Sequence, residues 1–183
     1  MTTEAESDII PKRIFQTWKS KTALPENFAY WRSTFIDKNP GYHFDLWDDA
    51  DNRAFIAGHF KWFLPVYDNY PAEIYRADII RYFYLYVFGG LYADLDTQCV
   101  KALDNVLDRS GVVLGRMGTD PTFVHSIPNA VMASSPREEF WLYVIASALV
   151  AAERPSGESS TFFGPSPPKC SHTAAEPGPP LKQ

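Results

Sequence analysis

The chain has 183 residues, of which 45% are hydrophobic and 15% aromatic, enough for one domain with a sizeable core. Its formal charge is −5 and no cluster of Lys and Arg offsets that balance, which argues against a surface for nucleic acid or another polyanion. The two cysteines provide neither a disulfide framework nor the spacing of a zinc site. We therefore expect a globular, aromatic-rich protein without a nucleic-acid partner.

The sequence contains no pattern typical of a membrane span or a signal peptide. The longest apolar helix candidate, residues 140–152, is shorter than the roughly 20 residues that a bilayer requires. The first residues lack a basic region followed by an apolar one. We therefore expect the chain as given to be soluble, with no transmembrane segment.

The two ends of the sequence differ in composition from its middle. Residues 1–9 are polar, and we expect a disordered N-terminus there. Residues 153–183 contain seven of the 15 prolines together with Gly, Ser and Thr, so we expect a Pro-rich, disordered tail. The folded part is predicted to comprise residues 10–152.

The middle of the sequence alternates between strand and helix patterns. Residues 10–18 are predicted to form a strand that ends in Trp18, and residues 25–38 a helix with an apolar stripe. Residues 42–46 alternate apolar and polar side chains, which predicts a second strand, and another helix follows Trp47. This alternation is typical of an α/β sandwich with a largely parallel sheet, in which ligands gather at the carboxyl ends of the strands.

Residues 75–96 are predicted to form a helix, a tight reversal at Gly89-Gly90 and a strand. Glycine suits the end of a helix because a residue without Cβ adopts positive φ easily. Two charged residues lie about 12 to 17 Å before the reversal along the helix, and two more lie about 16 to 23 Å after it along the strand. If the strand runs back along the helix, the four side chains reach the same end. These four are Asp78, Arg81, Asp94 and Asp96.

Asp94 and Asp96 are two residues apart and are predicted to share one side of the extended strand. Two close carboxylates raise each other's pKa unless a cation lies beside them. Carboxylate oxygens suit Mg2+ or Mn2+, which completes its coordination shell with water and substrate phosphates. The pair therefore predicts a metal site that binds a diphosphate, as in a nucleotide-sugar donor.

Two more elements are predicted after this stretch. Residues 111–114 form a strand pattern. Ser135 and Glu138 match a capping box with Pro136 at the first helical position, so a helix is predicted from there to about Ala152.

An acidic triplet alone is a weak signal, because 13 aspartates in 183 residues produce about one D-x-D by chance. A second triplet, Asp49-Ala50-Asp51, indeed occurs in a polar, helix-starting context. The longer pattern, A-D-x-x-R followed by G-G-x-Y-x-D-x-D between Ala77 and Asp96, is much more specific. It resembles the sugar-binding region of the family 32 glycosyltransferases.

The resemblance covers roughly residues 10–140 and implies a GT-A-like nucleotide-diphospho-sugar transferase fold, incomplete at the C-terminus. It implies a metal-dependent, retaining glycosyltransferase that moves mannose, galactose or glucose from GDP-mannose or a UDP-sugar to a glycan or sphingolipid hydroxyl. Mn2+ or Mg2+ is the implied cofactor. Family analogy also implies a location in the Golgi or secretory pathway. The C-terminal segments that help to close the site in the family are not found after residue 152, so we expect sugar transfer by this chain to be slow or absent.

The same resemblance assigns residues to roles. Asp94 and Asp96 are the implied catalytic and metal-binding pair, with Asp96 on the metal and Asp94 bound through water or to the ribose. The implied donor-binding residues are Trp18 on the nucleotide base, Asp78 and Arg81 on sugar hydroxyls, and Asn129.

Two other classes stay open. A haloacid-dehalogenase-like phosphohydrolase also uses D-x-D after a strand, but it expects Thr or Val two residues after the second Asp, where this chain has Gln98. The other is a non-catalytic fragment that binds nucleotide-sugars.

Overall fold

The computed structural model describes residues 9–116 and 127–153, with side chains up to residue 150. The strands in these ranges are β1 Arg13–Thr17, β2 His43–Trp47, β3 Gly90–Ala93, β4 Val112–Leu114 and β5 Val131–Ser134. The helices are α1 Glu26–Lys38, α2 Asp49–His59, α3 Leu64–Asp68, α4 Glu73–Phe88, α5 Asp104–Leu107 and α6 Glu139–Glu153. Nearly all of the N-terminus and tail predicted to be disordered lies outside the described residues.

The five strands form one sheet in the order β2-β1-β3-β5-β4. Strand β1 pairs in parallel with β2 and with β3, whereas β5 is antiparallel to both β3 and β4. Four strands therefore run in one direction and β5 runs against them, which confirms the predicted α/β architecture and the largely parallel sheet. We call the side of the sheet where β1, β2 and β3 end its carboxyl edge.

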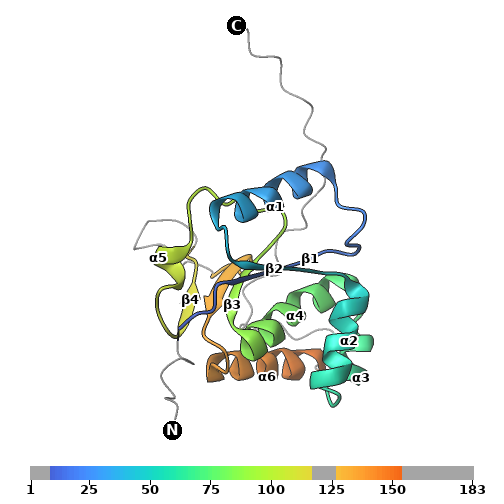
Figure 1. Cartoon of the computed structure of the whole chain (residues 1–183). Helices are drawn as coiled ribbons and strands as arrows, with labels where there is room; N and C mark the ends of the chain where they lie inside the picture. Colours follow the sequence, from blue (N-terminus) through green and yellow to red (C-terminus); the bar gives the residue numbers. More distant parts are fainter. Residues whose placement is uncertain (1–8, 117–126, 154–183) are drawn as a thin grey trace, which may run out of the picture.

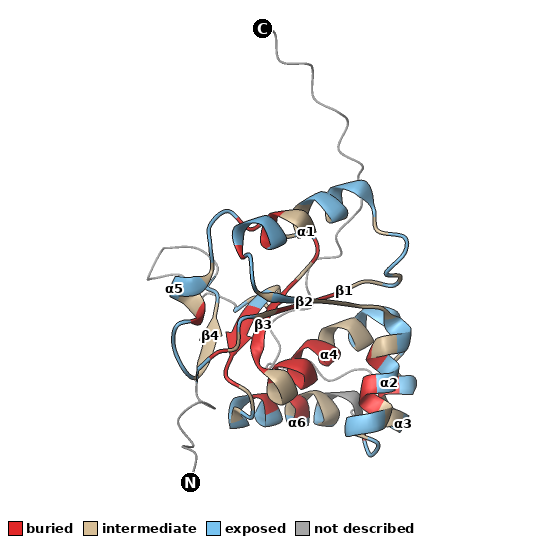
Figure 2. Ribbon diagram, in the orientation of Figure 1, coloured by how far each residue is buried: buried red, intermediate tan, exposed pale blue. Residues whose placement is uncertain are grey.

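Helices cover both faces of this sheet. Helix α1 lies over one face, and α2, α4 and α6 lie over the other (Figure 1). Ile14 belongs to the apolar cluster on the α1 face and Phe15 to the larger cluster on the α4 face, because successive strand residues point to opposite sides. Buried residues are concentrated in β1, β3 and β5 and along α4 (Figure 2), so α4 and these strands form the centre of the core.

The reversal between α4 and β3 depends on two glycines, as predicted. Gly89 has φ of 64° and Gly90 has φ of 92°, a region that side chains with Cβ rarely adopt. A Cβ on Gly90 would lie 2.5 Å from the carbonyl oxygen of Arg13, and one on Gly89 would lie 2.7 Å from the backbone nitrogen of Pro136. The glycines thus allow β1 and the segment before α6 to approach the turn closely.

The last helix begins later than predicted. Helix α6 starts at Glu139, and Arg137 lies in a turn with φ of 66°. The Ser135 hydroxyl accepts a hydrogen bond from the backbone N–H of Gly111 at 3.0 Å, and the N–H of Arg137 donates to the carbonyl of Tyr86 at 2.7 Å. The predicted capping box is wrong because these long-range partners hold the segment in a turn.

Gly90→Ala tests the close approach at this reversal. We expect it to lower the free energy of unfolding by more than about 2 kcal/mol, since the new methyl group combines positive φ with overlap on a backbone carbonyl. Urea denaturation measures the change. The matched control is Gly58→Ala in α2, where nothing lies within 4 Å of the new Cβ and a gain of roughly 0.5 to 1 kcal/mol is expected. Equal stability of Gly90→Ala and the unchanged protein would contradict this account.

Candidate functional site

A buried arginine brings together three elements at the carboxyl edge. Arg81 of α4 is only 4% exposed. Its Nη2 lies 2.6 Å from Oδ1 of Asp78, and its Nη1 lies 3.2 Å from Oδ1 of Asp94. The same Nη1 donates to the backbone carbonyl of Asn129 at 2.8 Å. The predicted convergence of Asp78, Arg81 and Asp94 is therefore confirmed, and Asn129 joins them.

Two tyrosines that the sequence analysis did not single out complete this cluster. The Tyr92 hydroxyl donates to Oδ1 of Asp94 at 2.5 Å, and the Arg81 guanidinium lies 4.5 Å from the centre of the Tyr92 ring. Nδ2 of Asn129 lies 3.2 Å from the Tyr82 hydroxyl. Spacing was the available signal, because Tyr92 is two residues before Asp94 on a strand and Tyr82 is four residues after Asp78 on the same helix.

Asp96 is placed differently from the prediction. Strand β3 ends at Ala93, and the N–H and the hydroxyl of Thr97 both donate to the carbonyl of Asp94, at 3.2 Å and 2.5 Å. These hydrogen bonds close a turn through Leu95 and Asp96. The expectation that both carboxylates share one side of an extended strand is therefore wrong, and Asp96 lies exposed on the turn.

The electrostatics of the cluster favour a cation. Burial raises the pKa of the Asp94 carboxyl; Arg81 and the Tyr92 hydroxyl oppose this, while Asp96 and Asp78 raise the pKa further. Among the described residues, Arg81 pairs with Asp78 and Asp94, and Asp96 adds a third carboxylate that acts on Asp94, so these four groups carry a formal excess of two negative charges.

The carboxylates present suit a metal ion that is also bound by substrate phosphates and water better than one held by protein side chains alone. Among the described residues, no group of three or more His, Cys, Asp and Glu side chains could hold a metal ion. Asp94 and Asp96 offer two carboxylates, the number that Mg2+ or Mn2+ typically takes when phosphate oxygens and water complete its shell. The residues present fit an ion of this kind bound together with a diphosphate.

Trp18 lies at the same edge but apart from the arginine cluster. Its backbone N–H donates to the carbonyl of Trp47 at 3.0 Å, which continues the β1–β2 pairing beyond the strands. Its ring packs edge-to-face on Phe28 of α1, with ring centres 4.8 Å apart. Its Nε1 is buried and has no hydrogen-bond partner among the described residues.

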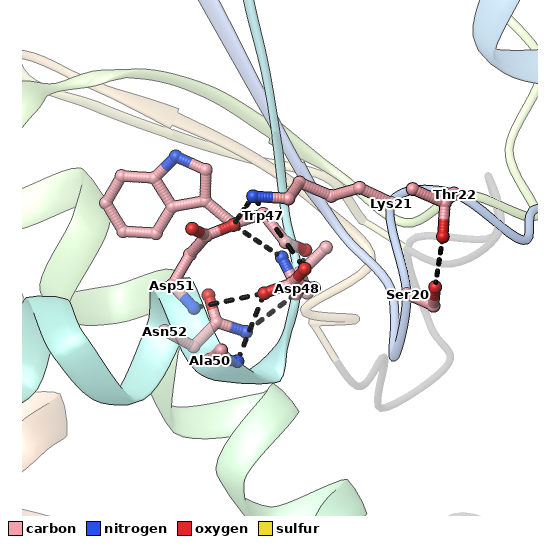
Figure 3. Close-up of polar contacts among 9 residues, drawn as sticks. Ser20, Lys21, Thr22, Trp47, Asp48, Ala50, Asp51 and Asn52 are labelled. Carbon is pink, nitrogen blue, oxygen red and sulfur yellow. Dashed lines mark hydrogen bonds and ion pairs between the residues drawn. The ribbon is translucent and has the colours of Figure 1, made fainter.

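The second acidic triplet has a structural role. The carboxylate of Asp48 accepts from the backbone N–H groups of Ala50 and Asp51 at 3.1 Å each, and the Asp51 carboxylate accepts from the N–H of Asp48 at 3.0 Å. Lys21 reaches across to Asp51 at 2.6 Å (Figure 3). These contacts cap α2 and tie the loop after β1 to it.

Comparison with known proteins relates the chain to sugar transferases. Residues 25–113 match the family described as glycosyltransferase sugar-binding region containing DXD motif. The chain is 42% identical over 137 residues to inositol phosphoceramide mannosyltransferase 2 of Schizosaccharomyces pombe, which covers 75% of this chain and 38% of that protein. It is 40% identical over 144 residues to mannosyl phosphorylinositol ceramide synthase CSH1 of Saccharomyces cerevisiae, covering 79% and 36%. The chain thus spans little more than a third of these relatives.

Two further comparisons extend this relationship. The initiation-specific alpha-1,6-mannosyltransferase of Candida albicans is 32% identical over 115 residues, covering 60% of this chain and 30% of that protein. Among solved structures, PaToxG glycosyltransferase superposes with a TM-score of 0.59 at 18% identity, covering 80% of this chain and 64% of that one. This likeness shows a GT-A-like fold, as the sequence resemblance implied.

Arg81→Met tests whether the buried cation holds the cluster together. The change leaves Asp78 and Asp94 facing each other without their partner, and we expect a loss of about 3 kcal/mol in the free energy of unfolding. Arg53→Met is the control, because Arg53 also pairs with an aspartate, Asp68, but both side chains are exposed (55% and 38%) and a much smaller loss is expected. Similar losses in the two variants, measured by urea denaturation, would refute the central role of Arg81.

Proposed function

We propose that this chain, which belongs to the glycosyltransferase family with a DXD-containing sugar-binding region, binds a nucleotide-sugar donor and transfers its sugar, slowly, to a hydroxyl acceptor. The observation that carries this proposal is the convergence of Asp78, Arg81 and Asp94 at the carboxyl edge, beside exposed Asp96. Carboxyl edges of α/β sheets are where such ligands bind. The mannosyltransferase relatives support the same reaction class.

The acidic turn would hold the diphosphate. Asp96 would bind Mn2+ or Mg2+ directly, and Asp94 would act through a bound water or contact the ribose, because Arg81 and Tyr92 already occupy one of its oxygens. A bound ion of this kind neutralises the charge that develops on a diphosphate leaving group. The protein's own contribution is to fix the two carboxylates in position.

The helix face would hold the sugar. Asp78 uses Oδ1 for Arg81 and Asn129, and its Oδ2 has no hydrogen-bond partner among the described residues, so this oxygen could accept from a sugar hydroxyl. Arg81 orients Asp78 and Asp94 together. Asn129 is tied to α4 through its carbonyl, which accepts from Arg81, and through its side-chain amide, which donates to the Tyr82 hydroxyl. Trp18, at the end of β1, would stack on the nucleotide base.

The donor and acceptor follow from the relatives by analogy. GDP-mannose is the first candidate donor because the relatives are mannosyltransferases, with UDP-sugars as the alternative. The names of two relatives suggest a sphingolipid acceptor such as inositol phosphoceramide, with a glycan as the alternative. Retention of configuration and a Golgi location are further family analogies. Within the described residues, none of the helices has the length and apolar character that a bilayer crossing requires.

A transfer assay tests the proposal. The chain is incubated with radiolabelled GDP-mannose, UDP-galactose or UDP-glucose, glycoside or glycolipid acceptors, and either Mn2+ or EDTA. Metal-dependent labelling of an acceptor supports the glycosyltransferase. Binding without transfer favours a nucleotide-sugar-binding protein, and phosphate release from simple phosphomonoesters favours a phosphohydrolase.

Asp96→Asn tests the metal assignment. An amide oxygen is a neutral and poorer ligand, so we expect Mn2+-dependent binding of GDP or UDP to weaken at least about tenfold in calorimetric titration, with the fold unchanged because Asp96 is exposed. The control is Asp49→Asn in the second triplet, which should bind as the unchanged protein does. Unaltered affinity of Asp96→Asn would remove Asp96 from the metal site.

Asp78→Ala tests the sugar pocket. A hydrogen bond to a charged group contributes about 1.5 to 3 kcal/mol, so the nucleotide-sugar should lose roughly 10- to 100-fold in affinity. The bare nucleotide diphosphate makes no such contact and should change little. Equal losses for both ligands in the same titrations would show that Asp78 only supports the structure.

A further inference from the structure

A second polar cluster lies at the end of β1, on the α1 face of the sheet. Gln16 is fully buried, with 0% of its surface exposed. Its Oε1 accepts a hydrogen bond from Nη1 of Arg32 at 2.8 Å, but its Nε2 has no partner among the described residues. A buried amide that lacks a partner is costly, since the group loses its water without a replacement. The unused donor therefore calls for an explanation.

Arg32 adds unmatched positive charge to this cluster. Among the described residues it makes no ion pair within 4 Å, and its described hydrogen-bond partner is the neutral amide of Gln16. Burial lowers the pKa of the Arg32 guanidinium, and the charge of Asp45 only partly offsets this. The Arg32 guanidinium is therefore half-buried, and its remaining N–H groups have no hydrogen-bond partner among the described residues.

The cluster is continuous with Trp18. Phe28 and Arg32 are four residues apart on α1, so they share one helix face, and Trp18 packs on Phe28 while Gln16 bonds Arg32. Gln16 and Trp18 are themselves two residues apart at the end of β1. The parallel register of Phe15 with Tyr92 places this end of β1 beside the end of β3, where Asp94 follows.

The loop that carries Trp18 is fixed in place. Lys21 pairs with Asp51 at 2.6 Å and lies 3.7 Å from Asp48, which joins the loop after β1 to the start of α2 (Figure 3). Lys21 thus holds the loop of Trp18, and the hydrogen bond to Gln16 holds Arg32.

The unused groups in this cluster are all donors: Nε2 of Gln16, Nε1 of Trp18 and the remaining N–H groups of Arg32. Such a set matches a ligand edge that presents only acceptors. Guanine has adjacent O6 and N7 acceptors, which a guanidinium binds with two parallel hydrogen bonds. Adenine places an amino donor beside N7, and uracil has a single carbonyl at the corresponding edge.

We propose that Arg32, oriented by Gln16, determines base specificity by donating to O6 and N7 of a guanine that stacks on Trp18. The inference rests on the proposed function, because it requires a nucleotide donor whose base lies at Trp18. It goes further by assigning the choice of base to a residue on the opposite face of the sheet from the sugar pocket.

Arg32→Ala tests the assignment by calorimetric titration of the whole chain with GDP, UDP and 7-deazaguanosine diphosphate in Mn2+. Loss of a bidentate contact of about 1 to 3 kcal/mol should weaken GDP about 5- to 100-fold and leave UDP nearly unchanged. The unchanged protein should bind the 7-deaza analogue more weakly than GDP, and this difference should vanish in the variant. Arg32→Lys, which keeps the charge but not the planar fork, should lose most of the preference for guanine.

The ratio of GDP to UDP affinity separates base recognition from damage to the fold, because a structural defect weakens both nucleotides alike. Arg53→Ala on α2 is the matched control and should leave the ratio unchanged. An unaltered ratio in Arg32→Ala, with nucleotides still bound, overturns the inference and leaves the proposed function standing. Failure of the unchanged protein to bind any of the nucleotides overturns both.

Discussion

The buried guanidinium of Arg81 is the constraint on which the candidate site depends. A charge in the protein interior is stable only when its partners hold it closely, since its desolvation otherwise costs several kcal/mol. Its partners come from α4 itself, from the end of β3 and from the residue pair before β5. Satisfying this one cation therefore fixes three elements relative to one another, and the surplus of carboxylate charge that remains faces the carboxyl edge.

Helix α4 is held toward its C-terminal end by a second set of contacts. There the Gly89-Gly90 turn lies against β1, and the Asp45 carboxylate accepts from Nε of Arg13 at 2.6 Å and from the Tyr84 hydroxyl at 2.7 Å. Arg13 is the first residue of β1 and Asp45 is the central residue of β2. With the middle and the C-terminal end of α4 anchored, the side chains of Asp78 and Arg81 have little freedom to move relative to Asp94. A rigid arrangement of this kind suits a site that must position a donor before transfer.

Much of this arrangement was predictable from sequence because regular periodicity decides which residues share a face. The spacing of Asp78 and Arg81 on a helix, the glycine pair and the short strand before Asp94 together predicted the observed cluster. Local patterns failed where a distant partner decided the outcome. The hydrogen bonds from Thr97 to the carbonyl of Asp94 place Asp96 in a turn. The backbone N–H of Gly111 donates to the Ser135 hydroxyl, which the predicted capping box required as its own acceptor.

Contacts between side chains far apart in sequence were also beyond local patterns. The side-chain amide of Asn129 donates a hydrogen bond to Tyr82, which is 47 residues away in the sequence, and Arg32 donates one to Gln16, which is 16 residues away. The roles of Trp18, Asp94 and Asp96 in binding a donor and a metal stay predictions, since they concern ligands rather than the fold. The family match includes Asp78, Arg81, Asp94 and Asp96 but not Trp18 or Asn129.

The central claim is that a metal ion and a nucleotide diphosphate bind together at the acidic turn of the carboxyl edge. Paramagnetic broadening of backbone amide signals by Mn2+, recorded with and without GDP-mannose, tests it most directly. The account predicts that the strongest broadening falls on residues 94–97 and on Ala130, whose carbonyl accepts a hydrogen bond from the N–H of Asp94 at 2.8 Å. It also predicts that the nucleotide-sugar increases this broadening. Strongest broadening at the second acidic triplet of α2, or broadening that GDP-mannose leaves unchanged, would contradict the account.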